Sequence, residues 1–122
     1  MTLLFVCIGA AVGAPARYLT DRAIASRHDS VFPWGTFAVN VVGSLVLGVL
    51  VGAATQREVP PGLVAGLGTG FCGALTTYST FGYETLRLAE DGARLIATLN
   101  VVASIAAGLG AAAGGYLLGQ AL

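Results

Sequence analysis

The sequence is poor in charged residues and contains no lysine. Only 10% of its 122 residues are charged, whereas a soluble domain carries about 25%. The six basic residues, all arginines, balance six acidic residues to a net charge of zero, which offers no general attraction to nucleic acid. So few charges cannot solvate a chain that is 56% hydrophobic. We therefore expect lipid to form part of its boundary.

Residues that build metal, disulfide and catalytic sites are equally scarce. Cys7 and Cys72 lie in apolar stretches, without the spacing of a disulfide framework or a metal-ligand cluster. The single histidine, His28, is predicted to lie in a loop with no further ligands near it. The serines form no G-x-S-x-G hydrolase motif, and no acid/base pair is present. The sequence therefore predicts no enzyme.

Long uncharged stretches divide the chain instead. Residues 1–16, 30–56, 59–83 and 95–122 carry no charged side chain. A bilayer core requires about 20 helical residues per crossing, and backbone groups in lipid must bond within their own segment. We predict an all-α integral membrane protein, with residues 1–122 forming a single four-helix transmembrane domain. The approximate helices are 2–25, 33–54, 62–86 and 95–119.

The arginines around the predicted connections are unevenly distributed. Arg22 and Arg27 flank the first connection, Arg87 and Arg94 flank the third, and Arg57 stands by the second. Because positive residues stay on the cytoplasmic side, connections one and three are predicted to be cytoplasmic and both termini external.

The chain contains 18 glycines, many of which recur at intervals of four residues. Such spacing lets helix backbones approach each other closely within a membrane. We therefore predict tightly packed helices along these sets: Gly9 with Gly13, Gly48 with Gly52, Gly62 with Gly66 and Gly70, Gly110 with Gly114, and Gly115 with Gly119.

Uncharged polar residues recur on single faces of two predicted helices. The second carries Thr36, Asn40 and Ser44 at intervals of four, and the fourth carries Asn100 and Ser104 in the same way. An asparagine that faced lipid would be costly, so both stripes should face protein or water. Hydrogen bonding between helices and the lining of a transport path are the two interpretations.

The third predicted span, with hydroxyl, aromatic and glycine residues over 70–82, is a poor continuous helix. We expect a break near Gly73–Thr76, with a glycine-kinked packing helix as the alternative. Broken helices in transport proteins expose backbone groups to ions. Asparagine amides and hydroxyls donate hydrogen bonds, and aromatic ring edges carry partial positive charge. A lining of such uncharged groups suits a small, strongly hydrated anion.

Three segments resemble signatures of one family, the fluoride channels called Fluc or CrcB. Residues 70–81 resemble its third-helix signature, residues 35–44 its second and residues 9–18 its first. The resemblance implies two oppositely oriented subunits forming an antiparallel dimer with two pores. It also implies passive, selective export of cytoplasmic fluoride across a bacterial or archaeal plasma membrane, which confers fluoride resistance.

The same resemblance implies residue roles. It places Arg17 near a pore mouth and Glu84 near a vestibule, and it has the backbone carbonyls of Gly73 and Thr76 from both subunits hold a central structural Na⁺. The family commonly has Phe where this chain has Tyr78, so rate or selectivity could differ. The residues implied to line the fluoride pore are Asn40, Tyr78, Ser79, Thr80, Phe81 and Ser104.

Several alternatives stay open at the level of sequence. The dimer could be a homodimer inserted in both orientations, or a heterodimer with a homologue of opposite charge bias, which the uneven arginines favour. A small multidrug exporter would need a carboxylate within the membrane, for which Glu84 is the one candidate. A structural subunit without transport activity would explain the glycine stripes but not the polar ones.

Overall fold

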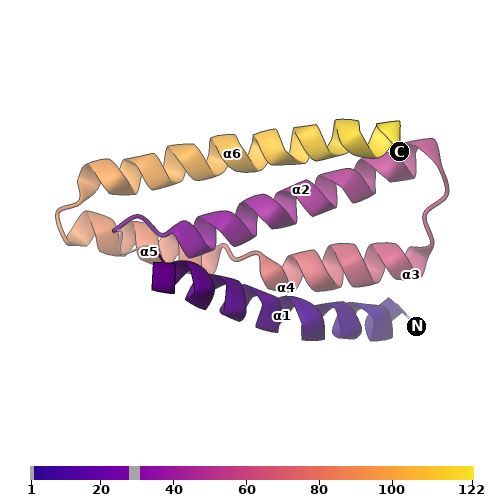
Figure 1. Cartoon of the computed structure of the whole chain (residues 1–122), viewed down its shortest axis with the longest axis horizontal. Helices are drawn as coiled ribbons and strands as arrows, with labels where there is room; N and C mark the ends of the chain where they lie inside the picture. The colour runs from indigo at the N-terminus through magenta and orange to yellow at the C-terminus, as the bar shows by residue number, and fades with distance from the viewer. Residues whose placement is uncertain (1, 28–30) are drawn as a thin grey trace.

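The computed structural model describes residues 2–27 and 31–122, and within these ranges it contains helices and no strand (Figure 1). His28, expected in the first loop, lies outside the described residues. The elements, in chain order, are α1 (Thr2–Arg27), α2 (Trp34–Gln56), α3 (Pro61–Leu63), the π-helix η1 (Val64–Cys72), α4 (Gly73–Leu75), α5 (Ser79–Glu90) and α6 (Arg94–Ala121).

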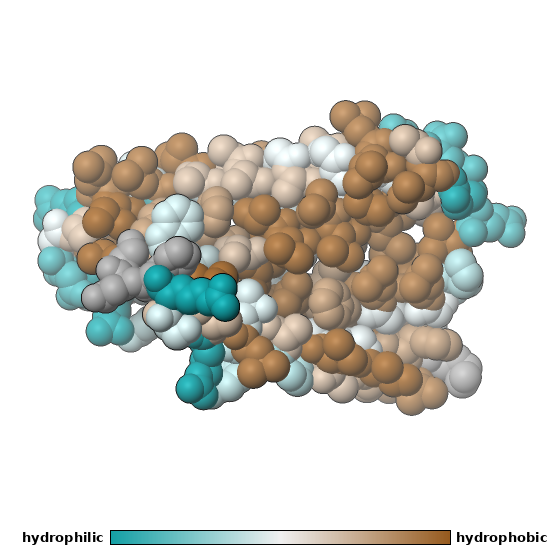
Figure 2. Space-filling view, in the orientation of Figure 1, coloured by the Kyte–Doolittle hydropathy of each residue, from teal (hydrophilic) through white to brown (hydrophobic). Residues whose placement is uncertain are grey.

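Three of these helices, α1, α2 and α6, are long and apolar enough to cross a membrane. Their outward side chains are largely apolar, as with Leu109, which is 68% exposed. Figure 2 shows this apolar surface along the body of the molecule, with hydrophilic residues gathered towards its two ends. A surface of this kind is stable only in lipid, so the chain is a multi-pass membrane protein.

The helices form two packed pairs. α2 runs along α6, while α1 runs along η1 and α4 (Figure 1). α5 continues beyond α4 and packs on the first part of α6. The N- and C-termini lie at the same end of the molecule in Figure 1, so the chain begins and ends on one side.

Glycines allow the backbones of α2 and α6 to touch. A Cβ atom added at Gly48 would collide with the carbonyl of Ala112, and one added at Gly115 would collide with the carbonyl of Leu45. Gly52 and Gly119 repeat this arrangement one turn further along each helix. We call this contact the glycine seam. Because the missing side chains leave room for direct backbone contact, dispersion and close packing hold the two helices together.

The α1–η1 pair is built in the same way, since a Cβ atom at Gly9 would collide with the carbonyl of Gly66. One predicted glycine set differs. Cβ atoms at Gly110 and Gly114 would meet no heavy atom within 4 Å. Gly114 precedes Gly115 by one residue, about 100° around the helix, so it faces away from α2.

Residues 61–90, where we expected a span over 62–86 with a break near Gly73–Thr76, form four consecutive helical elements. α4 ends at Leu75 and α5 begins at Ser79, so the three residues between them are not helical. Thr76, with φ of −80° and ψ of 158°, is extended. We call Thr76–Tyr78 the linker. Its β-branched and aromatic residues lose rotamer freedom in a helix, which makes this the place where helical structure is least favourable.

Candidate functional site

The linker is held by the side chain of Asn40 on α2. Asn40 Nδ2 donates to the carbonyl of Thr77 at 3.0 Å, and the N–H of Thr77 donates to Asn40 Oδ1 at 2.8 Å. Both backbone groups of Thr77 are therefore satisfied by one amide, as they would be by a neighbouring strand. The Asn40 amide carries a second N–H, which is available to another acceptor.

This arrangement diverts two amide N–H groups from the carbonyls that a continuing α-helix would give them. The N–H of Thr77 goes to Asn40 instead of the carbonyl of Gly73. The N–H of Thr80 goes to Thr77 Oγ1, at 3.1 Å, instead of the carbonyl of Thr76. A Cβ atom at Gly73 would meet nothing within 4 Å, so the chain leaves open space beside this residue. Carbonyl oxygens released from a helix are the ligands that a hard cation prefers.

A groove of about 650 Å³ lies beside the linker, between α2, α4, α5 and α6. We call it the central groove. Gly73 and Thr76 also line it, so the proposed cation ligands and the proposed pore residues lie together. Tyr78 is 86% exposed, which leaves one side of the groove uncovered by this chain. The polar and aromatic residues of the groove are Asn40, Ser44, Thr76, Thr77, Tyr78, Phe81 and Ser104.

Phe81 and Tyr78 bring two aromatic rings into the groove. Their ring centroids lie 6.3 Å apart, with the ring planes at 41° to each other. The edge of an aromatic ring carries partial positive charge, so such rings attract an anion at their rims. Together with the second N–H of Asn40, these ring edges give the groove several groups of partial positive charge, and none of its lining residues carries a full charge.

The polar surface continues past the linker in two further cavities. A small pocket of about 190 Å³ is lined by Arg17 and Asp21 from α1, and by Thr36 from α2. Thr77 lines both this pocket and the central groove. Thr80 lines both this pocket and a third cavity. The three hollows therefore follow one another along the linker and the start of α5.

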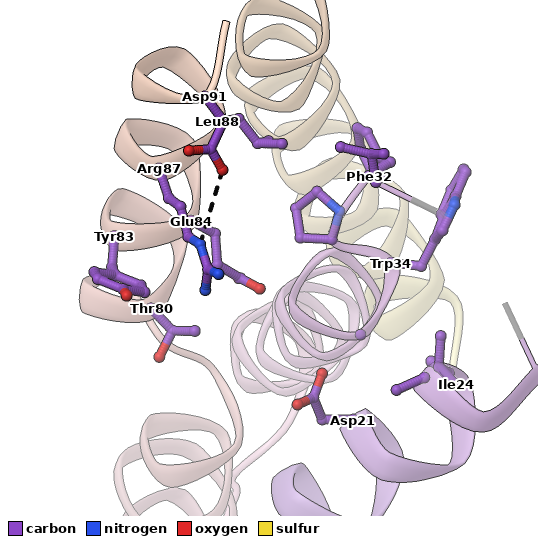
Figure 3. Close-up of a pocket in the computed structure, with 14 residues that line it drawn as sticks. Asp21, Ile24, Phe32, Trp34, Thr80, Tyr83, Glu84, Arg87, Leu88 and Asp91 are labelled. Carbon is purple, nitrogen blue, oxygen red and sulfur yellow. Dashed lines mark ion pairs between the residues drawn. The ribbon is translucent and has the colours of Figure 1, made fainter. Parts of the chain in front are cut away.

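The third cavity, which we call the end cavity, has a volume of about 500 Å³ and is lined by residues from the last turns of α1, the start of α2 and α5 (Figure 3). Asp21 and Glu84 point into it from α1 and α5. Thr36, which is 5% exposed, donates a hydrogen bond of 2.5 Å to Glu84 Oε1 and so orients this carboxylate. Arg87 forms an exposed ion pair with Asp91 at 4.0 Å, which adds little to stability.

The structure thus brings together most of the predicted site residues. Asn40, Tyr78, Phe81 and Ser104 share the central groove with Gly73 and Thr76. Thr80 and Arg17 both line the small pocket, and Glu84 lines the end cavity. Ser79 is exposed at the start of α5 and lines none of these three hollows.

Several contributors to the site were not among the predicted residues. Thr77 is the anchoring point of the linker, and Thr36 holds Glu84 across 48 positions of sequence. The polar stripe on α2 gave a signal for Thr36, because it stands one turn before Asn40. No spacing in the sequence could have identified Thr77 as the partner of Asn40, since 37 positions separate them.

Comparison with known proteins places these features in a family. Residues 4–116 match the sequence profile of the family described as CrcB-like protein, Camphor Resistance (CrcB). The chain is 62% identical over 122 residues to fluoride-specific ion channel FluC 1 of Streptomyces avermitilis, covering 100% of this chain and 98% of that protein.

Two further relatives carry the same kind of name. Fluoride-specific ion channel FluC 1 of Frankia casuarinae is 60% identical over 128 residues, which cover 100% of this chain and 98% of the relative. Fluoride-specific ion channel FluC of Geobacter sulfurreducens is 44% identical over 106 residues, which cover 86% of each chain. The similarity therefore extends over nearly the whole length of the chain and of its relatives.

Proposed function

We infer that this chain, which belongs to the CrcB family, is a fluoride-specific ion channel that lets fluoride leave the cytoplasm passively and so confers fluoride resistance. The names of relatives 43–62% identical to it support this function. A channel binds and releases an ion without chemical conversion, and the proposed role is accordingly not that of an enzyme.

The observation that carries the proposal is the lining of the central groove. Asn40 has an N–H free to donate, and Tyr78 and Phe81 bring ring edges to the same space. These groups replace the water around a small anion while leaving it able to move on, because none of them carries a full charge. Ser104 completes this wall, and Thr80 extends the polar surface towards the small pocket. Ser79, which is exposed beside them, would join the path once the groove is covered.

The ends of this path are assigned to charged residues. Arg17 lines the small pocket and would attract fluoride near a pore mouth. Glu84, held by Thr36 in the end cavity, would mark the vestibule on the side of the first and third connections. A proton-coupled drug exporter would need such a carboxylate in its binding site, whereas Glu84 lies outside the central groove.

We propose that a second copy of the fold covers the groove, as an antiparallel dimer. Non-helical backbone and polar side chains at membrane depth are tolerated only where protein or water covers them. The linker, which includes the exposed Tyr78, is open on one side in a single chain. A subunit of opposite orientation, either the same chain or a homologue, would close the groove. The third span would then act as one broken transmembrane helix.

The released carbonyls at the linker fit a structural Na⁺ between two such subunits. Gly73 and Thr76 both lose their usual N–H donors to the hydrogen bonds made by Thr77 and Thr80. These carbonyl oxygens would coordinate a bound sodium ion, and the ion would hold the two linkers together. We propose that the protein lies in a bacterial or archaeal plasma membrane, where the surrounding lipid completes its boundary.

Fluoride efflux from liposomes tests the proposed function. The purified chain, reconstituted without a proton gradient, should release loaded fluoride as measured with a fluoride electrode, while chloride stays inside. Liposomes without protein provide the control for leakage. Equal release of chloride and fluoride would contradict a fluoride-specific channel.

A further inference from the structure

Behind the wall of the central groove, four residues form an unbroken chain of hydrogen bonds. Ser104 Oγ donates to Asn100 Oδ1 at 3.2 Å, and Asn100 Nδ2 donates to Thr85 Oγ1 at 2.8 Å. Thr85 Oγ1 in turn donates to the backbone carbonyl of Phe81 at 2.8 Å. The two ends of this chain, Ser104 and Phe81, both line the groove.

The carbonyl at one end fixes the direction of every bond. A backbone carbonyl can only accept, so the single proton of the Thr85 hydroxyl is committed to Phe81. The oxygen of Thr85 must then accept from Asn100, which turns the amide nitrogen towards Thr85 and the amide oxygen towards Ser104. Ser104 therefore donates its only hydroxyl proton to Asn100.

Asn100 occupies the centre of this chain and does not line the groove. Its side chain is 1% exposed, which makes it one of the most deeply buried residues of the protein. It belongs to α6, whereas Thr85 belongs to α5, so their hydrogen bond joins the two helices that carry Ser104 and Phe81. A buried amide is costly unless its groups are bonded, and here the amide bonds on both sides.

We propose that Asn100 and Thr85 are positioning residues of the fluoride path: they hold Phe81 and Ser104 in fixed register across the α5–α6 contact and set the direction of the Ser104 hydroxyl. This inference rests on the proposed channel function. It extends the site to two residues that do not contact the ion. An apolar residue in either place breaks the hydrogen bond between the two helices, and an apolar residue in place of Asn100 also frees the Ser104 side chain.

Thr85 offers a sharp test, because the chain contains a matched threonine elsewhere. Thr98 also donates to the carbonyl four residues before it, at 2.9 Å, but it is exposed on α6 and stands outside the hydrogen-bond chain. Thr85→Val should lower fluoride efflux from liposomes by about tenfold, the effect of one lost hydrogen bond on a barrier. Thr98→Val should leave efflux unchanged, and Thr85→Ser, which keeps the hydroxyl, should restore most of it.

Asn100→Leu provides an independent variant of similar volume, should Thr85→Val not assemble. It should lower efflux to a similar extent, and the double variant should be no slower than the slower single variant, because both changes interrupt one chain. All variants are compared at equal amounts of protein with the same assembly size on gel filtration. A purely structural role would lower the yield and stability of Thr85→Val but not the efflux per assembled protein.

The outcomes separate the inference from the function beneath it. If the unaltered chain passes no fluoride, the proposed function fails. If the unaltered chain passes fluoride and Thr85→Val and Asn100→Leu pass it equally fast, the channel stands and the positioning role is wrong. If Thr85→Ser is as slow as Thr85→Val, the hydroxyl is not the group that matters, and the proposal is again wrong.

Discussion

The glycine seam and the linker both bring backbone atoms into contact with a neighbouring helix, but they do so in opposite ways. Along the seam, α2 and α6 approach so closely that backbone touches backbone, and side chains are absent at Gly48 and Gly115. At the linker, backbone groups have left the helix, and a side chain, that of Asn40, replaces the missing partners. The seam places two continuous helices side by side, whereas the linker leaves backbone and side-chain groups facing the central groove.

From this difference we expect the seam to serve stability and the linker to serve conduction. Removing contacts from the seam should weaken the fold before it alters conduction. Removing the hydrogen bonds of the linker should alter conduction in a protein that still assembles. Four substitutions test this division.

The largest effect is expected for Asn40→Ala. This change removes the partner of both Thr77 backbone groups and a donor of the central groove, a loss of about 3 kcal/mol that corresponds to a roughly hundredfold fall in fluoride flux. Efflux from liposomes measures it. Gln56→Ala, which removes an exposed amide from the end of the same helix, serves as the control. Flux at the level of the unaltered chain would show that the linker does not depend on Asn40.

Gly115→Ala tests the seam. The added methyl group would collide with the carbonyl of Leu45, and the helices can separate only at a cost of about 2 kcal/mol in the free energy of unfolding. Gly114→Ala, one residue earlier, adds the same methyl group where it meets no heavy atom within 4 Å of the chain. Thermal unfolding in detergent should distinguish the two variants. Equal unfolding temperatures would remove the seam as a source of stability.

Phe81→Ile tests whether an aromatic ring edge, and not apolar bulk alone, serves the groove. The loss of the ring edge should lower fluoride flux by about fivefold, because aromatic contacts contribute about 1 kcal/mol. Phe37→Ile makes the same replacement in the aromatic cluster around Trp34, outside the groove, and should conduct normally. If both variants conduct alike, the ring of Phe81 does not meet the ion.

The smallest effect is expected for Thr36→Val. It removes the hydroxyl that orients Glu84 in the end cavity and should slow fluoride flux by about threefold, the lower range for one hydrogen bond. Thr36→Ser keeps the hydroxyl and should match the unaltered chain. A Thr36→Val variant that conducts as fast as the serine variant would separate the end cavity from the conduction path.

The sequence predicted the helical membrane architecture, because charge and hydropathy decide whether a segment can lie in lipid. The predicted family is confirmed by the match over residues 4–116. The two asparagines were identified as residues that must face protein or water, since their cost in lipid depends on position alone. Their partners were not identified, because Thr77 and Thr85 come close to Asn40 and Asn100 only through the packing of helices.

The third span was the hardest part to predict. Its glycines and hydroxyl residues indicated a weak helix, but the position of the linker depends on which amides find other acceptors. Asn40 takes the N–H of Thr77, and Thr77 takes that of Thr80. The π-helix η1 gives no periodic signal of its own in nine residues, so sequence reasoning could not distinguish it from an α-helix.

Both ends of the chain lie at one end of the molecule, and this restricts how a pair of such units could be encoded. Two copies translated in tandem through a short connector would insert with the same orientation. A fused protein that presents one unit inverted relative to the other therefore requires an odd number of additional membrane crossings between them. Two separate genes, or one gene whose product inserts in both orientations, can supply two oppositely oriented units without any connector.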